Sequence, residues 1–201
     1  MEEETKNFSS LVKKRIVVRE FKEPRTGKFD PDIKEIASNG VKIPTAGFSR
    51  GIEVLTILDH DNIKKIAVIT NEKKYTSKGL DPWISWAEGI IIILINKNAY
   101  IERYGKEDKN SSLNIDNWHM PYWYIDAGAA LMNILLGAED KELGSGFLGG
   151  HNIHLNNLKS EFKIPKEIEV LGLVPIGVRK HNNRKNTTEK KKLIHTEVYG
   201  K

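Results

Sequence analysis

Apolar residues follow two different periods along this chain, and together they predict a mixture of strands and helices. The clearest strand is Gly89–Ile95, a β-branched run that is too short for a buried helix to be preferred. Ile52–Leu58 is also almost wholly apolar and predicts a second, central strand. Ile168–Val178 predicts a third strand, and Leu193–Tyr199 predicts a fourth near the C-terminus.

The remaining apolar residues recur at helical spacing. The longest helix is expected at Pro121–Leu143, where apolar and small residues recur at intervals of three and four, and the glycine-rich turn Leu143–Gly150 ends it. A helix is also expected at Asp30–Gly40, with Asp30 as its cap and Pro31 in its first turn. Shorter helices are expected from Ser9 or Ser10 to Lys14, at Asp61–Asn71, at Asn98–Tyr104 and at about His154–Phe162.

Length and composition narrow the fold class. At 201 residues the chain can close one sizeable core, so we expect a single α+β domain over residues 1–201. The chain has no cysteine, which excludes disulfides, thiolate metal sites and a cysteine nucleophile. Any redox chemistry must then come from a cofactor.

The formal charge of +5 is concentrated near the C-terminus. Between Arg179 and Lys192 there are seven Lys or Arg residues and one Glu, without helical or strand periodicity. Residues 179–201 are therefore expected to form a basic connector followed by a terminal strand. The connector is interpreted as a solvated linker, as a nucleic-acid arm or as a segment that folds onto a cofactor phosphate. Nucleic acid is not the expected partner, because no recognised module or interleaved aromatic pattern accompanies the charge.

The sequence predicts a cytoplasmic protein without a membrane partner. Its acidic start, Met1–Lys6, lacks the basic and apolar layout of a signal peptide. The longest apolar run is far shorter than the roughly 20 residues that span a bilayer.

Two N-terminal segments carry the most specific chemistry. Arg15-Ile16-Val17-Val18-Arg19-Glu20-Phe21 places two guanidinium groups four residues apart, just after a short helix, as a phosphate clamp would. Ile43-Pro44-Thr45-Ala46-Gly47-Phe48-Ser49-Arg50-Gly51 is a loop of small and hydroxyl-bearing residues that leads into an apolar strand. Taken alone, two such arginines would more commonly be exposed charges that flank an extended apolar pair.

Together these segments resemble the N-terminal signatures of the FMN-dependent nitroreductase family, Arg-Arg-Ser-x-Arg-x-Phe and Pro-Ser-x-x-Asn-x-Gln-Pro. The central helix followed by a Gly-Leu-Gly-type turn is similar to Asp126–Ala130 and Leu143–Gly149. The late Pro-x-Gly strand is similar to Val174–Val178. Because these landmarks arrive in the family's order, the resemblance extends from about Ser9 to Tyr199.

The resemblance implies a nitroreductase-like α+β fold, with a mostly antiparallel central sheet flanked by helices and a C-terminal extension swapped across a homodimer. By this resemblance, the Arg15–Arg19 segment contacts the phosphate and ribityl chain of FMN. Val17 replaces the usual serine, so only its backbone can bind the cofactor there. The late basic pair is expected to close over the same phosphate. The implied cofactor-binding residues are Arg15, Ile16, Val17, Arg19, Pro44, Thr45, Ala46, Phe48, Arg50, Phe147, Leu148, Gly149, Arg184 and Lys185.

The same resemblance distributes the flavin ring contacts. Pro44, Thr45 and Ala46 correspond to a loop that the partner subunit lays on the ring, whereas the backbone N–H groups of Leu148 and Gly149 face its reactive edge. Phe48 and Arg50 stand where many family members have Asn and Gln. They could narrow the pocket or select an anionic substrate or cofactor. Alternatively, Phe48 is a core residue and Arg50 a surface charge. Trp118 and Tyr122 are expected in the substrate pocket, although clustered aromatics are more often core.

The implied activity is ping-pong hydride transfer from NAD(P)H through FMN to a nitroaromatic, a quinone or a similar small acceptor. Each homodimer would hold two shared FMN sites, with no catalytic side chain and no metal. Two alternatives stay open. One is a flavin-fragmenting oxygenase of the dimethylbenzimidazole-synthase type, which shares Gly-Phe at Gly47-Phe48 but has an aspartate where this chain has Val17. The other is a non-enzymatic basic nucleic-acid-binding domain.

Overall fold

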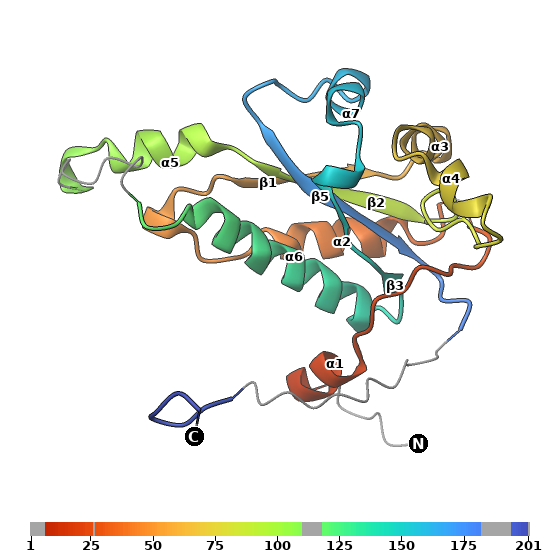
Figure 1. Ribbon diagram of the computed structural model, residues 1–201, viewed down its shortest axis with the longest axis horizontal. Helices are drawn as coiled ribbons and strands as arrows, with labels where there is room; N and C mark the ends of the chain where they lie inside the picture. Colours follow the sequence, from red (N-terminus) through yellow and green to blue (C-terminus); the bar gives the residue numbers. More distant parts are fainter. Residues whose placement is uncertain (1–6, 26, 110–117, 182–193, 201) are drawn as a thin grey trace.

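The computed structural model describes residues 7–25, 27–109, 118–181 and 194–200, and it contains one antiparallel sheet with helices on both faces (Figure 1). The strand order is β1 (Ile52–Ile57), β2 (Gly89–Ile95), β5 (Glu169–Gly177) and β3 (Gly144–Ser145). The short strand β4 (Leu148–Gly149) also pairs with β5, along the edge opposite β2. The predicted α+β class with a mostly antiparallel central sheet is confirmed.

Strand β2 is the centre of the molecule, because all seven of its residues are buried. Its side chains alternate between the two faces of the sheet. Ile90, Ile92 and Leu94 belong to one hydrophobic core. Ile91, Ile93 and Ile95 belong to the other. An uninterrupted apolar run is what a strand covered on both faces requires.

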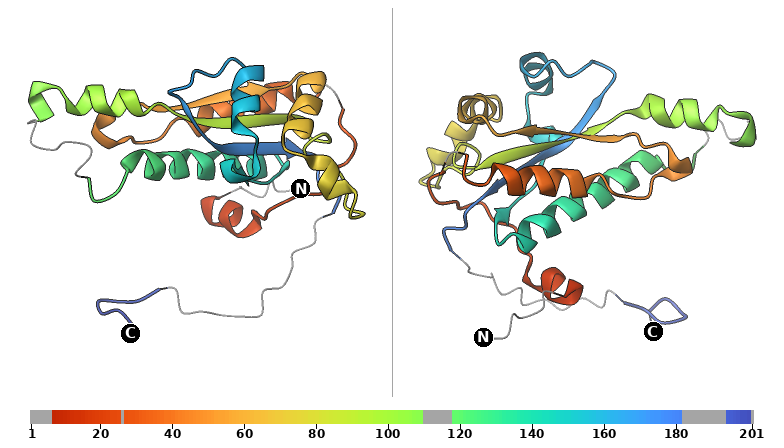
Figure 2. Two further views of the ribbon diagram at one scale, coloured as in Figure 1. Left: turned by 45° about the horizontal axis from the view of Figure 1, so that its top comes forward. Right: turned by 180° about the vertical axis from the view of Figure 1, so that it is seen from behind.

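Two pairs of helices form the covering layers (Figure 2). On one face lie α2 (Asp30–Gly40) and α6 (Tyr122–Asp140), whose buried residues include Ile36 and Ile134. On the other lie α3 (His60–Ile69) and α7 (Leu155–Glu161), which bury Ile66 and Leu158. The other helical segments are α1 (Phe8–Lys14), η1 (Ala46–Phe48), α4 (Glu72–Thr76), α5 (Lys97–Tyr104), η2 (Glu107–Lys109) and η4 (Gly150–Asn152).

All the predicted helices are present, but the details of their ends differ. Helix α1 is capped by Asn7, whose Oδ1 accepts a hydrogen bond from the Ser10 N–H at 2.8 Å, and not by Ser9 or Ser10. Phe29, not Asp30, occupies the cap position of α2. The helix expected at Asp61–Asn71 ends at Ile69, because Asn71 has a left-handed conformation (φ 55°) that separates α3 from α4.

One prediction about strands is wrong. Strand β1 is not central: it forms an edge of the described sheet, and Glu53 on it is exposed. The C-terminal strand, expected in an extension swapped onto a partner subunit, stays a prediction, because residues 194–200 form no strand within one chain. Ile194 and Tyr199 are 82% and 90% exposed, so this stretch has no neighbouring strand in the described chain with which to share a ladder.

None of the helices described here is long and apolar enough to cross a membrane.

Candidate functional site

The N-terminal segment reaches the sheet beside β3. Val17 forms a parallel bridge with Ser145, and the Val18 N–H donates to the Ser145 carbonyl at 2.9 Å. Gly146 permits this approach, because a Cβ there would lie 2.9 Å from the Val18 carbonyl oxygen. The segment therefore lies along β3, and Arg19, two residues beyond the bridge, lines the same cavity as Leu148 and Gly149 of β4.

Arg19 and β4 border a cavity of about 900 Å³. Trp83, Phe147 and Leu148 are among its apolar lining residues, and Arg19, Lys74 and Lys78 are its permanently or normally charged basic ones. Helix α4 and the turn after it also contribute lining residues. The lining residues are Arg19, Thr70, Asn71, Glu72, Lys74, Tyr75, Lys78, Leu80, Trp83, Ile84, Phe147, Leu148, Gly149, His151, Ile153 and His154.

Arg19 is exposed and makes no ion pair with any described carboxylate. Its guanidinium carbon lies 5.7 Å from the centre of the Trp83 ring, within the range of a cation–π contact. The face of the guanidinium is therefore supported by Trp83. Its N–H groups remain available to an anion in the cavity.

Glu72 fixes the position of Trp83. Its buried carboxylate accepts hydrogen bonds from three successive backbone N–H groups: those of Trp83 at 2.8 Å, Ile84 at 2.6 Å and Ser85 at 3.2 Å. A carboxylate bonded in this way holds both the start of α4 and the 83–85 segment. The sequence interpretation missed Glu72 and Trp83, because both lie in a polar stretch without clear periodicity.

Strand β4 presents a backbone edge to the same cavity. It pairs with β5 through Leu148 with Leu173 and Gly149 with Gly172. In an antiparallel pair, successive residues direct their N–H groups to opposite sides, so one of the Leu148 and Gly149 N–H groups points away from β5. The Phe147 ring lies over Gly172, where a Cβ would come within 2.6 Å of it.

Three neighbouring predicted residues do not line this cavity. Arg15 is half-buried at the end of α1, where its N–H donates to the Leu11 carbonyl. Ile16 is half-buried against the core, and Val17 is 55% exposed. Their contacts with a cofactor stay a prediction.

The loop Pro44–Arg50 is held by a buried acid on α6. Asp126 Oδ2 accepts hydrogen bonds from the Ala46 N–H at 2.9 Å and from the Tyr100 hydroxyl at 2.7 Å. Burial, reinforced by that hydrogen bond to Asp126, raises the pKa of Tyr100 above its usual value. Thr45 closes the loop, since its Oγ1 accepts from the Arg50 N–H at 3.0 Å. Neither Asp126 nor Tyr100 was identified from sequence as an anchor of this loop.

Phe48 and Arg50 stand out from the loop. Both have positive φ angles, 60° and 54°, which are uncommon for residues with a side chain. Phe48 is 69% exposed, and the Arg50 guanidinium lies 4.2 Å from the centre of its ring. A strained, exposed aromatic group that is partnered only by a cation points to a binding surface. The structure thus rules out the alternative of a core phenylalanine.

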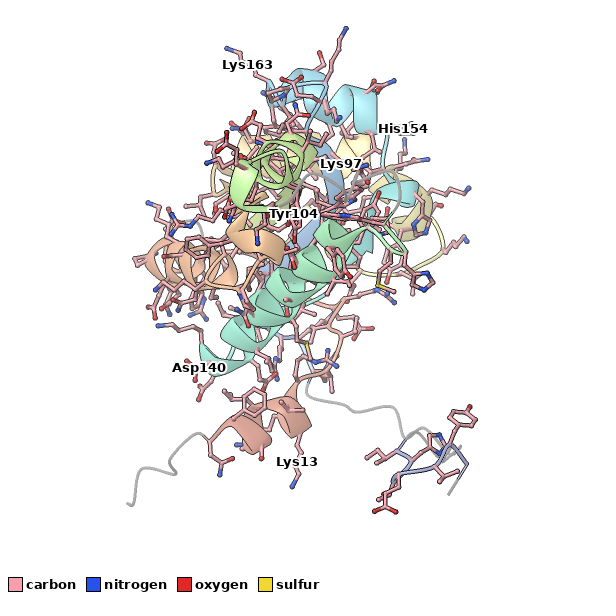
Figure 3. The ribbon with its side chains drawn as sticks, turned by 90° about the vertical axis from the view of Figure 1, so that its left-hand side faces the viewer. Lys13, Lys97, Tyr104, Asp140, His154 and Lys163 are labelled. Carbon is pink, nitrogen blue, oxygen red and sulfur yellow. The ribbon has the colours of Figure 1, made fainter. Side chains whose placement is uncertain are left out.

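Trp118 and Tyr122 belong to the same end of the molecule as this loop. Trp118 packs edge to face against Tyr104 and Tyr122, with ring centres 4.8 and 5.0 Å apart. Tyr104 in turn lies against Gly47, where a Cβ would come within 2.7 Å of its ring. Figure 3 shows Tyr104 near the upper end of α6, the end opposite Asp140. Neither Trp118 nor Tyr122 lines the cavity beside Arg19.

The predicted site residues therefore form two groups within one chain. We call the first the cavity half (Arg19, Phe147, Leu148 and Gly149). The second is the loop half (residues 44–50 with Trp118 and Tyr122). Figure 1 shows α5 and the neighbouring loop half at the left end of the molecule, whereas α4, a wall of the cavity, lies at the right. One chain does not bring the two halves together.

The predicted late basic pair, Arg184 and Lys185, lies outside the described residues. The start of the basic connector is described, and it is already engaged in the fold. Arg179 pairs with the buried Glu139 and donates to the Leu143 carbonyl, and Lys180 pairs with Asp81. These two cations are therefore structural.

Comparisons with known proteins agree with this architecture. A model of the nitroreductase family matches residues 12–178. The chain shares 20% identity and a TM-score of 0.70 with a candidate NADH dehydrogenase/NAD(P)H nitroreductase from Bacteroides thetaiotaomicron, over 97% of this chain and 100% of that one. A candidate NADH oxidase from Clostridium acetobutylicum shares 24% identity and a TM-score of 0.67, over 94% of this chain and 99% of that one. A nitroreductase-like protein from Streptococcus mutans shares 14% identity and a TM-score of 0.72, over 94% of this chain and 98% of that one. No curated protein matches.

Proposed function

Because the chain belongs to the nitroreductase family, we propose that it is an FMN-dependent oxidoreductase that works as a homodimer. In this proposal NAD(P)H is the electron donor, and a nitroaromatic, a quinone or a similar small molecule is the acceptor. The two substrates react in turn, in a ping-pong sequence.

The observation that carries the proposal is the separation of the cavity half from the loop half. Each half has features of a binding surface, namely a cation without a carboxylate partner beside a cavity and a strained loop with an exposed ring. A two-fold dimer would set the loop half of one subunit against the cavity half of the other, and would do so twice. The resemblance to nitroreductases supports the same arrangement, as does an apolar C-terminal stretch left exposed in one chain.

The residues present fit a flavin mononucleotide. The volume of about 900 Å³ lies within the range of about 300–1,000 Å³ that is usual for small-molecule sites. Arg19 suits a phosphate, whereas Trp83, Phe147 and Leu148 offer apolar surface to a ring system. Gly144, Gly146 and Gly149 have the spacing of a dinucleotide fingerprint, but they lie on the β3–β4 edge and not at a turn from a strand into a helix. We therefore expect FMN and not FAD.

When bound, the flavin supplies the redox centre, which accepts a hydride from the nicotinamide and passes reducing equivalents to the acceptor. The chain's own groups would bind and orient the cofactor. Arg19, with Arg15 in the proposal, would hold the phosphate, and a β4 backbone N–H would stabilise negative charge that develops on the ring. The partner's loop would cover the ring. Hydride transfer itself needs no side-chain acid or base, and the proton that completes reduction of the acceptor would come from solvent.

The proposal is tested on the purified protein. We expect a yellow protein that releases one FMN per chain on denaturation, as identified by mass analysis. Its visible absorbance should bleach when NADH or NADPH is added under anaerobic conditions. Reoxidation by a quinone or a nitroaromatic should restore the colour. Stoichiometric FAD would contradict the cofactor assignment, and a colourless protein that does not take up added FMN would contradict the function.

A further inference from the structure

We infer that Arg103 on α5 is a positioning residue that acts across the subunit boundary, because its guanidinium holds the loop half in the shape that meets the partner subunit's cavity. The inference rests on the proposed function, in which the loop of one subunit covers the flavin of the other. Arg103 itself would contact neither cofactor nor substrate.

The backbone of the loop half needs support from outside the loop. Gly47, Phe48 and Arg50 have left-handed φ angles of 62°, 60° and 54°. For a residue with a side chain this conformation is unfavourable and persists only where the surrounding structure holds it. Phe48 and Arg50 are both exposed, so their own packing contributes little. Neighbouring elements must therefore hold the loop.

Helix α5 supplies part of this support through Arg103. Its Nε–H donates a hydrogen bond to the Gly47 carbonyl at 2.8 Å. Its two terminal nitrogens donate to the two carboxylate oxygens of Asp108, each at 2.8 Å. A bidentate pair fixes the plane of a guanidinium group. Asp108 thus keeps the Nε–H of Arg103 directed at the loop.

Helix α6 holds the same stretch of backbone through a different atom. Asp126 accepts a hydrogen bond from the Ala46 N–H at 2.9 Å, one residue before the carbonyl that Arg103 holds. The loop is therefore tied at two successive residues, to α6 through a donor and to α5 through an acceptor. Loss of the α5 tie would leave the residues that follow free to turn away from their present direction.

A surface ion pair that serves stability alone is the simpler interpretation of Arg103 and Asp108. Their side chains are 23% and 63% exposed, and exposed pairs contribute little to stability. That interpretation leaves the third bond, to the carbonyl of a strained loop, unexplained. The two interpretations differ in outcome, because only a positioning role makes the loss of Arg103 harm the site on the other subunit.

The test uses the flavin-loaded protein and the variants Arg103→Ala, Arg103→Lys and Asp108→Asn. Lys106→Ala is the matched control, because Lys106 is an exposed cation three residues after Arg103 that makes no ion pair with a described carboxylate. It should behave like the parent.

We expect Arg103→Ala to lower kcat/KM for NADH and a quinone about ten- to a hundredfold, since a displaced loop misaligns the reacting groups. The midpoint of thermal unfolding should change little, because the ion pair is exposed. Lysine keeps the charge but lacks the planar fork that holds Gly47 and Asp108 together, so Arg103→Lys should restore little activity. Asp108→Asn should cause a smaller loss of the same kind.

Mixed dimers show which site Arg103 serves. Refolded with Arg19→Ala, at an FMN concentration well below the dissociation constant of that variant, Arg103→Ala should regain activity, because one site then has an intact cavity and an intact loop. Refolded with Phe48→Asp, it should not, because the loops of both subunits are defective. Damage to the whole Arg103→Ala subunit would prevent rescue in both mixtures. An effect on its own cavity would reverse the pattern.

Three results would overturn the inference: activity of Arg103→Ala equal to that of Lys106→Ala, rescue in neither mixture, or the reversed pattern. If Arg103→Ala does not fold, the same two mixtures made with Asp108→Asn decide the question. Failure of the proposed function looks different. A parent protein without flavin, or no rescue between Arg19→Ala and Phe48→Asp, would contradict the shared flavin site itself.

Discussion

Arg19 is the charged side chain on which the cofactor assignment depends most. It lines the cavity, stacks near Trp83 and has no described carboxylate partner. An exposed arginine without a ligand usually serves solubility alone. Its place in the lining of the cavity that Leu148 and Gly149 of β4 also line distinguishes it from such a surface charge.

We predict that Arg19→Ala weakens FMN binding about ten- to a hundredfold, because a charge-assisted phosphate contact of about 1.5–3 kcal/mol is lost. Arg15→Ala should have an effect of the same size if Arg15 also holds the phosphate. Flavin fluorescence titration measures the dissociation constant. Lys13→Ala, on the exposed surface of α1 (Figure 3), is the control for net charge and should bind FMN like the parent. Retention of tight binding by Arg19→Ala would remove the phosphate assignment.

Gly172 provides a second test at the scale of one residue. A Cβ there would lie 2.4 Å from the Leu148 carbonyl oxygen and 2.6 Å from the Phe147 ring, so β4 would have to move. We expect Gly172→Ala to lower the free energy of unfolding by about 1–3 kcal/mol and to weaken flavin binding as well. Chemical denaturation and flavin titration measure the two effects.

Gly128→Ala is the matched control for that substitution. Gly128 is on α6, and a Cβ there meets no atom within 4 Å. Alanine should stabilise the helix by up to about 1 kcal/mol, because it restricts the unfolded chain more than glycine does. If Gly128→Ala lost as much stability as Gly172→Ala, crowding by the added Cβ would not be the cause of the loss at Gly172.

At the scale of elements, the sequence was most informative where burial alone decides the structure. The apolar run of β2 and the three-and-four spacing of α6 predicted both elements to within about three residues. Position within the sheet was not predictable in the same way. Strand β1 is apolar yet lies at an edge, because strand order depends on which segments pair across the whole chain.

The site residues show the same limit. Arg19 and Phe147–Gly149 were found because a family pattern marks them, and the structure places them around one cavity. Glu72, Trp83 and Asp126 were missed, because each acts through backbone N–H groups or rings far away in the sequence. Contacts between distant segments leave no periodic signal in one sequence.

Asp126 on α6 anchors η1 and also accepts a hydrogen bond from Tyr100 on α5, and this arrangement predicts that the stability of the fold depends on pH. The pKa of Tyr100 is raised in the folded state, so the folded protein keeps a proton that the unfolded chain loses above pH about 10. This contribution to stability is complete below pH 10 and is lost as the pH rises further. We expect a decline of up to about 1.4 kcal/mol per pH unit from this one group.

Tyr100→Phe should remove that alkaline decline. It should also lower the free energy of unfolding by about 1–3 kcal/mol at pH 8, since Asp126 loses a hydrogen-bond donor. Urea denaturation at pH 8 to 12 measures both effects. Tyr199→Phe is the control, because Tyr199 is 90% exposed. Identical alkaline slopes in the parent and in Tyr100→Phe would contradict the assignment.

At the scale of the whole molecule, a site shared between subunits predicts that two defective variants rescue each other. Arg19→Ala damages the cavity half. Phe48→Asp damages the loop half and should fold, because Phe48 is exposed and aspartate tolerates its positive φ better. At an FMN concentration well below the dissociation constant of Arg19→Ala, each variant alone should be nearly inactive.

Unfolding the two variants together and refolding them in equal amounts should give mixed dimers. About half of the dimers would be mixed, and each mixed dimer would hold one intact site, so activity should return to about a quarter of the parental value. A mixture of the variants refolded separately is the control. No rescue in the mixed dimers would show that each site is complete within one chain.

The N-terminal segment has a consequence for the order in which this chain folds and opens. It joins the sheet through the Val18 N–H to the Ser145 carbonyl and the Lys22 N–H to the Val178 carbonyl, contacts between the first and the last parts of the chain. Contacts between distant parts of a chain are slow to form, and a segment that joins the sheet through isolated bridges opens more readily than a strand with a continuous ladder. A ligand that binds Arg19, one residue beyond Val18, would hold this strand in place. The hydrogen-exchange rate of the Val18 amide should therefore fall when cofactor binds, and that amide would report occupancy of the site from within the backbone.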